Sequence, residues 1–489
     1  MLCDILLLYY LAWSKGVYSS SGFRANHSKS HHVDLSNRNL HDIPLNIPIY
    51  TESLDLSHNQ IQNIPNDIFT NLSNIRTLDM SFNEINEIFV NSFKGLSRIE
   101  SLNLAQNQLT HESMQNKSFI HISSLKILQI QGNPYDGTSS ISFSDELYRL
   151  RMLHTMHLNG IDTEPNKLYK FECFKKLKVL SFESLMSVKN TTFQSFQNLP
   201  IEELAILHIR HAQKNAFSFF PKLKKLSLSL SWRSVSLEQF FPTLEIFKGR
   251  KMTSIILTGN IDSNSFKLGQ SHFRYIWNIC LKELHLPSNK IEDIDALSFK
   301  EFAKKSICLE VFDMSNNPLQ TEKFYWWMFF PLFKNLKVVR FSHMGFRPSS
   351  ERLVHKSLQG TLEYKLPSTL QEFSNNFGYT RYGWPNITVT DGQSLKILNL
   401  FQIKFRHCLG SFGGFPNLTL LDISGFNCTY LNPDMLQFLP RLENFTAQNT
   451  NLNHGLNFLG ESGARFFTNL SYLHYVDLST NNLDSLDSD

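Results

Sequence analysis

The sequence predicts an elongated α/β repeat solenoid with a parallel β-sheet on its concave face. Two observations lead to this fold class: seven short stretches nearly repeat one another, and each alternates apolar and polar residues as a strand with one buried face does. The first three stretches begin 24 residues apart. The stretches are Leu54 to Ile61, Leu78 to Ile85, Leu102 to Leu109, Leu128 to Tyr135, Leu284 to Ile291, Phe312 to Leu319 and Val476 to Leu483.

The apolar positions fit LxxLxLxxNxL, the leucine-rich-repeat pattern, whose period is about 20 to 29 residues. One unit cannot bury its own leucines, so units stack until a continuous core forms. We therefore predict a leucine-rich-repeat horseshoe whose strands line the concave surface.

An asparagine follows each strand of the pattern. Its carboxamide has two donors and an acceptor, enough to satisfy backbone groups of the turn and of the neighbouring repeat. We expect these side chains to form a polar ladder. They are Asn59, Asn83, Asn107, Asn133, Asn289, Asn317 and Asn481.

A phenylalanine also recurs six residues before the first leucine of the strand. We expect these rings to fill the convex half of each coil, so the aromatic enrichment reflects packing, and no cofactor is expected. The rings belong to Phe69, Phe93, Phe119, Phe171, Phe217, Phe330, Phe412 and Phe467.

The repeat array is predicted to span residues 33–489 in about 18 repeats. The predicted strand centres are Val33, Leu54, Leu78, Leu102, Leu128, Met156, Leu180, Leu204, Leu226, Phe247, Leu284, Phe312, Val339, Phe373, Leu398, Leu421, Phe445 and Val476. The middle is irregular: the repeats from Met156 to Phe247 lack the asparagine, and the register up to Leu284 stays open because Ile256 to Asn260 could itself form a strand. No cap follows the last repeat, so we expect the natural protein to continue beyond Asp489.

Residues 1–19 are predicted to be a signal peptide and residues 20–32 a lead-in. The apolar run Ile5 to Trp13 has the length of a signal-peptide core, although Asp4 stands where a basic residue is usual. An uncleaved anchor or a disordered start is the alternative.

Nine Asn-x-Ser/Thr sequons agree with passage through the secretory pathway. Glycosylation is predicted at Asn71, Asn116, Asn190, Asn386, Asn417, Asn427 and Asn469. The other two sequons are Asn26 and Asn444, and Asn444 is expected to point from a strand into the concavity.

Cys280 and Cys308 each directly precede the first strand leucine of adjacent repeats. Equivalent residues of neighbouring strands lie about 4.8 Å apart, within reach of a disulfide bond. We predict that bond, with two buried thiols as the alternative. Cys408 and Cys428 are a weaker candidate pair because their positions within the repeat differ by three residues. Cys173 has no obvious partner.

No motif supports an enzyme: the chain has no nucleophile elbow, HExxH, P-loop or helix-opening GxGxxG. No catalytic residue or metal site is therefore predicted. The net charge of +4 is small for 489 residues, unlike that of a dedicated nucleic-acid binder.

Two hypotheses concern the concave face. Lys225, Lys248 and Arg250 are predicted to face it on successive strands, where they could bind nucleic acid or another acidic ligand. An ordinary solvated surface is the alternative. His157 and His285 occupy outward strand positions, and histidines there could make binding sensitive to endosomal acidity.

The repeats, the secretory start and the irregular middle resemble the extracellular part of a Toll-like receptor. Phe312 to Ser342 is similar to the long, aromatic-rich repeat of such receptors, and Leu366 to Asn376 resembles the segment that follows it. The resemblance implies a sensor on the extracellular or endosomal-lumen side of a membrane that captures a microbial or endogenous ligand as a homo- or heterodimer. Signalling would use a TIR domain and its adaptors, both outside this sequence.

The sequence departs from the family pattern: no paired-cysteine cap precedes Val33, and the residues up to Asp489 hold no C-terminal cap, membrane span or TIR domain. The ligand does not transfer either, because family members bind lipids, proteins or nucleic acids. The alternatives are a secreted, matrix-type leucine-rich-repeat protein and an adhesion receptor, each of which binds other proteins.

Overall fold

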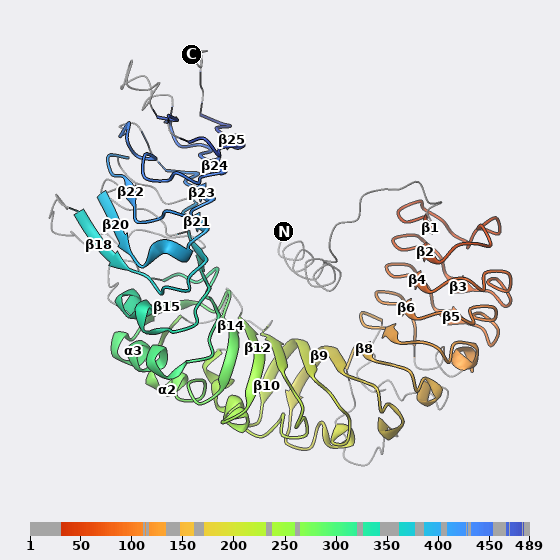
Figure 1. Cartoon of the computed structure of the whole chain (residues 1–489). Coiled ribbons are helices and arrows are strands. Elements are labelled where there is room, and N and C mark those ends of the chain that lie inside the picture. Colours follow the sequence, from red (N-terminus) through yellow and green to blue (C-terminus); the bar gives the residue numbers. More distant parts are fainter. Residues whose placement is uncertain are drawn as a thin grey trace.

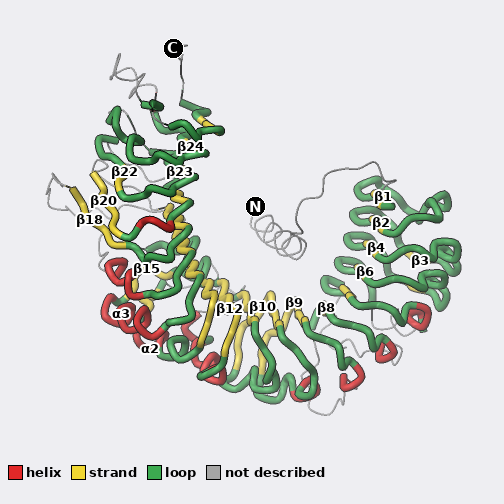
Figure 2. Tube along the Cα trace, viewed as in Figure 1, coloured by secondary structure: helices red, strands yellow, loops and turns green. Residues whose placement is uncertain are grey.

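The computed structural model describes residues 31–110, 113, 117–133, 147–160, 171–230, 237–259, 265–319, 326–342, 361–376, 386–401, 408–426, 428, 432–452, 466–468, 470–481 and 483. This part of the chain coils into an arc, with an 18-stranded parallel sheet on the concave side and short helical turns on the convex side (Figures 1 and 2). The predicted solenoid fold is confirmed.

Each strand of the large sheet pairs in parallel with the next one along the chain. In order, the strands are β1 (His32–Asp34), β2 (Ser53–Asp55), β4 (Thr77–Asp79), β6 (Ser101–Asn103), β7 (Ile127–Gln129), β8 (Thr155–Leu158), β9 (Val179–Val188), β10 (Glu203–Ala212), β11 (Lys225–Ser229), β12 (Lys251–Thr258), β14 (Cys280–His285), β16 (Val311–Asp313), β17 (Val338–Ser342), β19 (Glu372–Asn376), β21 (Ile397–Asn399), β23 (Leu420–Asp422), β24 (Asn444–Thr446) and β25 (Tyr475–Asp477).

The strand centres pair in register, Leu54 with Leu78 and Leu78 with Leu102, and all three are buried. The prediction was wrong at one repeat. Leu226 pairs with Ile255, so Ile255 and not Phe247 is the centre of β12. Phe247 instead ends a helical turn on the convex side.

The predicted asparagine ladder is present. Asn83 donates to the carbonyl of Leu56 at 2.9 Å in the preceding coil and to that of Met80 at 3.1 Å in its own, and its Oδ1 accepts from the amide of Ile61 at 3.0 Å. Asn107 repeats this pattern one coil later. Each carboxamide therefore joins two coils and satisfies backbone groups that would otherwise be buried without partners.

The asparagines missing from the middle repeats are replaced by longer strands. β9 and β10 each extend over 10 residues and stay paired out to Val188 and Ala212. In these two coils the backbone amides and carbonyls pair with the neighbouring strand, whereas in the regular coils the asparagine carboxamide pairs with them.

The residue before a ladder asparagine has a left-handed backbone, whatever its side chain. The φ angle is 56° at His58, 54° at Phe82, 55° at Gln106 and 60° at Thr480. These residues lie at the edge where the strands end, which we call the exit rim. The rings of His58 and Phe82 stack there with centroids 4.3 Å apart.

The convex side carries the aromatic spine and the helices. Of the predicted spine residues, Phe69 to Phe412 are buried, whereas Phe467 is half-buried and Phe466 is the buried residue of that coil. The helices are α2 (Gln270–Phe273) and α3 (Ala296–Lys305), and the 3-10 turns are η1 (Ser118–His121), η2 (Leu147–Arg149), η3 (Phe171–Cys173), η4 (Gln194–Phe196), η5 (Leu237–Gln239), η6 (Phe241–Phe247), η8 (Trp326–Leu332) and η9 (Gly392–Ser394).

Three small parallel sheets accompany the large one. β3 (Asn63–Ile64) pairs with β5 (Glu87–Ile88), and β13 (Phe266–Leu268) pairs with β15 (Ile291–Ile294). The third contains β18 (Thr361–Lys365), β20 (Asn386–Thr390) and β22 (Phe412–Gly413).

Two disulfide bonds link adjacent coils. Cys280 and Cys308 form the predicted bond, with Cα atoms 5.3 Å apart. Cys408 and Cys428 form the second, with Cα atoms 4.9 Å apart despite their different phases, and Cys173 is a free thiol. Within the described ranges, none of the helices has the length and hydrophobicity required to cross a membrane.

Candidate ligand-binding surface

The aspartates of the concave face have a structural role. The Oδ1 atom of Asp55 accepts from the amide of Ser57 at 2.8 Å, and Asp79 makes the same bond to Ser81 at 2.9 Å. The bond closes a short turn as the chain leaves the strand. The LDLS consensus is therefore explained by the turn and gives no information on a ligand.

Three cationic side chains of the concave face are paired with carboxylates. Lys225 lies 2.9 Å from Glu203 on the preceding strand. Arg340 makes two bonds of 2.7 and 3.0 Å to Glu372 on the next strand, the planar geometry that guanidinium and carboxylate favour. His285, the third, is held by the carboxylates of two strands. These pairs lower the net positive potential that an anion would meet.

Lys248 and Arg250 do not reach the concave face, so the predicted row with Lys225 does not form. Both follow η6 and precede β12, because the strand centre is Ile255 and not Phe247. Lys248 is exposed in this turn. The guanidinium of Arg250 donates to the carbonyl of Phe220 in the preceding coil at 3.1 Å and lies over the ring of Phe247 in its own coil, so it is fixed on the backbone side of the turn.

The histidines of the concave face do not support the acid-sensing hypothesis. Burial lowers the pKa of His157 to about 4. At His285 burial also opposes the charge, but Asp313 at 3.4 Å and Glu283 at 3.7 Å outweigh it and raise the pKa to about 9. These shifts move the two pKa values in opposite directions out of the range between neutral and endosomal pH, which argues against acid sensing by these side chains.

The other charged surface lies at the edge where the strands begin, which we call the entry rim. It is formed by the residues two, four and five positions before each strand centre. From the sequence, Lys222, Lys224 and Lys251 accompany the predicted concave cations, but the strand centres at Leu226 and Ile255 place them on this rim; runs such as FKKLKVL, which begins at Phe174, place three further lysines in these positions.

Several carboxylates of the entry rim lie between two cations of adjacent coils. Glu202 lies 2.7 Å from Lys224 and 3.2 Å from Lys178. Its hydrogen bonds to these ammonium groups lower its pKa. Glu310 makes the same arrangement with Lys337 at 2.8 Å and Lys282 at 3.3 Å. The rim therefore forms a ladder of ion pairs from coil to coil.

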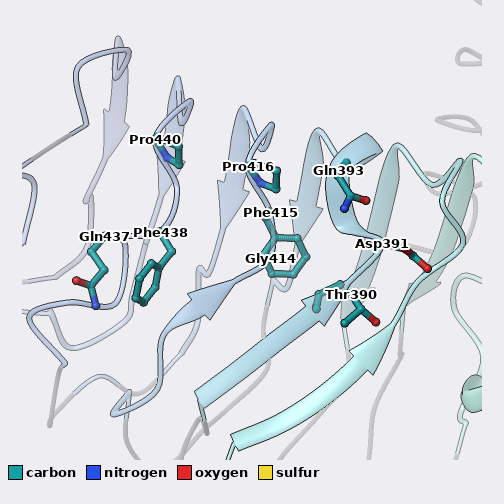
Figure 3. Close-up of a pocket in the computed structure, with 10 residues that line it drawn as sticks. Thr390, Asp391, Gln393, Gly414, Phe415, Pro416, Gln437, Phe438 and Pro440 are labelled. Carbon is teal, nitrogen blue, oxygen red and sulfur yellow. The ribbon is translucent and has the colours of Figure 1, made fainter.

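A shallow groove of about 750 Å³ crosses three coils near the C-terminal end of the arc (Figure 3). Its lining comes from the segments Val389 to Gln393, Gly414 to Pro416 and Gln437 to Pro440. Phe438 is half-exposed in it, and the carboxylate of Asp391 is paired with Lys365 at 3.2 Å. The lining offers mainly apolar contact and no arrangement of nucleophile and base.

The predicted glycosylation sites differ in their surroundings. Asn71 and Asn190 are exposed, and Asn386 is exposed at the start of β20. Asn417 is half-buried and donates to the carbonyl of Gln393 at 2.8 Å, beside the groove. Asn116, Asn427 and Asn469 lie outside the described residues.

Among the described residues, no three His, Cys, Asp or Glu side chains gather as metal ligands would. A leucine-rich-repeat family profile matches residues 50–109, and no curated protein matches the chain significantly. Proteins of this kind generally act as non-enzymatic scaffolds that bind other proteins on their extended surfaces. The matched repeats and the 18 stacked parallel strands show that the chain is a leucine-rich-repeat protein.

Proposed function

We propose that this chain is the ligand-binding ectodomain of an innate immune receptor of the Toll-like kind. In this proposal it captures a microbial or endogenous ligand outside the cell or in the endosomal lumen. Two copies, or this chain and a related one, then come together and signal through a TIR domain encoded beyond Asp489.

One observation carries the binding function: the sheet continues through 18 strands and keeps its core inside, so both rims and the concave face are available to a partner. The receptor assignment is supported by the sequence resemblance at Phe312 to Ser342 and Leu366 to Asn376. In the fold these segments supply β16, η8 and β17 in the first case and β19 in the second.

The receptor proposal is tested with a chimera that joins this chain to a membrane span and a TIR domain. Cells that carry the chimera and a TIR-dependent reporter are exposed to separate microbial lipid, protein and nucleic-acid fractions. We expect at least one fraction to activate the reporter, and the same fraction to double the mass of the purified chain in sedimentation velocity. A chimera lacking residues 33–489 is the control.

The opposite result would be a chain that stays monomeric and silent with every fraction. Retention of an extracellular-matrix protein by the chain, together with that silence, would favour the alternative of a secreted or adhesive leucine-rich-repeat protein. The sequence of the transcript downstream of Asp489 separates the two independently, because only the receptor requires a TIR domain there.

A further inference from the structure

Positive charge predominates on the entry rim in the middle of the arc. Six lysines lie there on the coils of β9, β11 and β12, and we call them the basic strip. They are Lys175, Lys176, Lys178, Lys222, Lys224 and Lys251, and all six are exposed. Within the same three positions of the four coils from β9 to β12, Glu202 is the only carboxylate.

Lysines are most numerous at these positions in this region, although the coil of β17 also holds Lys334 and Lys337 there. In the coils of β4 and β6 the same positions hold Ser73, Asn74, Arg76, Ser97, Arg98 and Glu100, and in the coil of β23 they hold Pro416, Asn417 and Thr419. Arg151 and Lys282 occupy the equivalent positions in the coils that flank the strip. The excess of positive charge is therefore greatest from β8 to β14 and is not a general property of the repeat.

Most of this charge is uncompensated. Glu202 pairs with Lys178 and Lys224. Across the described residues no carboxylate lies within ion-pair distance of Lys175, Lys222 or Lys251. Unpaired like charges held on a rigid edge raise the local potential and favour an anionic partner over a neutral one.

The dimensions of the strip decide which polyanion fits. Adjacent coils are spaced by about 4.8 Å, so the strip with its flanking cations is about 24 Å long. The strip is about 10 Å wide, because its residues lie from five to two positions before the strand centre. Glu203 on the concave side and Glu245 on the convex side pair with Lys225 and Lys214, so one cation on each side of the strip is neutralised.

A narrow strip suits one linear chain of anions. A nucleic-acid duplex presents two phosphate backbones across a groove of about 12 Å, and a second row of cations would be needed to meet both. A single-stranded nucleic acid binds largely by stacking its bases on aromatic side chains. In the coils from β8 to β12, the strip positions hold no Phe, Tyr or Trp.

The strip is also clear of predicted glycans. Between residues 149 and 282 the sequence has a single sequon, at Asn190. Asn190 lies beyond the end of β9, ten residues after the strand centre, whereas the strip lies at the opposite edge, where the strands begin. A bulky polymer can therefore approach this edge without meeting an attached sugar.

We propose that the basic strip is a binding site for a linear sulfated polysaccharide. The recognition is electrostatic: the lysine ammonium groups replace the counterions of successive sulfate groups, so affinity falls as salt concentration rises. The site goes beyond the receptor function proposed above and does not depend on it, because binding needs neither a second copy nor a signalling domain.

The test measures binding of the purified full chain to a fluorescent heparin oligosaccharide at several salt concentrations. A strip variant carries Lys175→Glu, Lys222→Glu and Lys251→Glu. A control variant carries Lys189→Glu, Lys334→Glu and Lys396→Glu, which change the net charge equally at exposed lysines outside the strip. Thermal melting of both variants checks that they fold as the wild type does.

We expect the strip variant to bind at least tenfold more weakly. The negative slope of log K against log salt concentration should become shallower by about three, one for each lost contact. The control variant should stay within twofold of the wild type. Equal losses in both variants, or no binding by the wild type, would overturn the proposal. Tighter binding to a nucleic-acid duplex of equal charge would overturn the choice of polysaccharide.

Discussion

Replacement of Asn83 by alanine tests the role of the polar ladder. The substitution removes the acceptor of one buried backbone group, the amide of Ile61. The carbonyls of Leu56 and Met80 lose one donor each but keep the carboxamides of Asn59 and Asn107. A buried group left without a partner costs about 1 to 3 kcal/mol, which corresponds to a change of about 5- to 150-fold in an opening equilibrium.

The assay should be local, because long repeat arrays do not unfold in a single step. Hydrogen exchange with peptide resolution reports the strands on both sides of Asn83 separately. We expect amides around Ile61 and Ile85 to exchange about 5- to 150-fold faster in Asn83→Ala, by the same loss of about 1 to 3 kcal/mol. Coils beyond β14 should exchange as before, because each coil contacts only its neighbours.

A matched control is available three residues away. Asn86 is exposed, and its side chain makes no hydrogen bond within the described residues, so Asn86→Ala should change stability by less than about 0.5 kcal/mol. The reasoning would be refuted if Asn83→Ala left exchange at Ile61 within threefold of the wild type, or if both substitutions had the same effect.

Two further predictions concern the middle of the arc. Cys308→Ser opens the 28-residue loop closed by Cys280, which should lower stability by about 3 to 4 kcal/mol, whereas Cys173→Ser at the free thiol should change the melting temperature little. The pKa of His285 is raised from 6.5 to about 9, so its contribution is fully present below pH 6.5 and is lost as pH rises through 9. The melting temperature should therefore fall between pH 6.5 and 9 in the wild type and less steeply in His285→Gln; parallel curves would exclude the interaction with Asp313 and Glu283.

The strand register could be predicted where the repeat pattern is complete. At Leu54, Leu78 and Leu102 the apolar spacing alone identifies the buried residue, because a shift by one position would turn every side chain to the opposite face. The predicted bond between Cys280 and Cys308 followed from the same argument, since residues of equal phase lie side by side in parallel strands.

The prediction at Phe247 failed for a physical reason. A helical turn buries apolar residues at intervals of three, as the repeat does before its strand, and Leu244 and Phe247 fit that interval. Met252, Ile255 and Leu257 fit the strand pattern equally well. The two patterns can be separated only when the pairing with β11 and β14 is known.

The charge state of the concave face could not be predicted from the sequence. His157 and His285 occupy equivalent positions on their strands, yet their pKa values shift in opposite directions. The difference comes from burial at His157 and from the carboxylates on β14 and β16 that surround His285. The repeat pattern shows which face of the strand a side chain occupies. It does not show which charged residues of the neighbouring coil lie next to that side chain.

The left-handed backbone of the exit rim has a consequence for how such a protein can diversify. The backbone of that turn is held by the asparagine that follows, and residues as different as His58, Phe82 and Thr480 are accepted there. Different side chains can therefore be placed along the exit rim, one coil at a time, without a change in the buried core. Over evolutionary time the exit rim is a place where the molecule can acquire a new partner at little risk to its architecture.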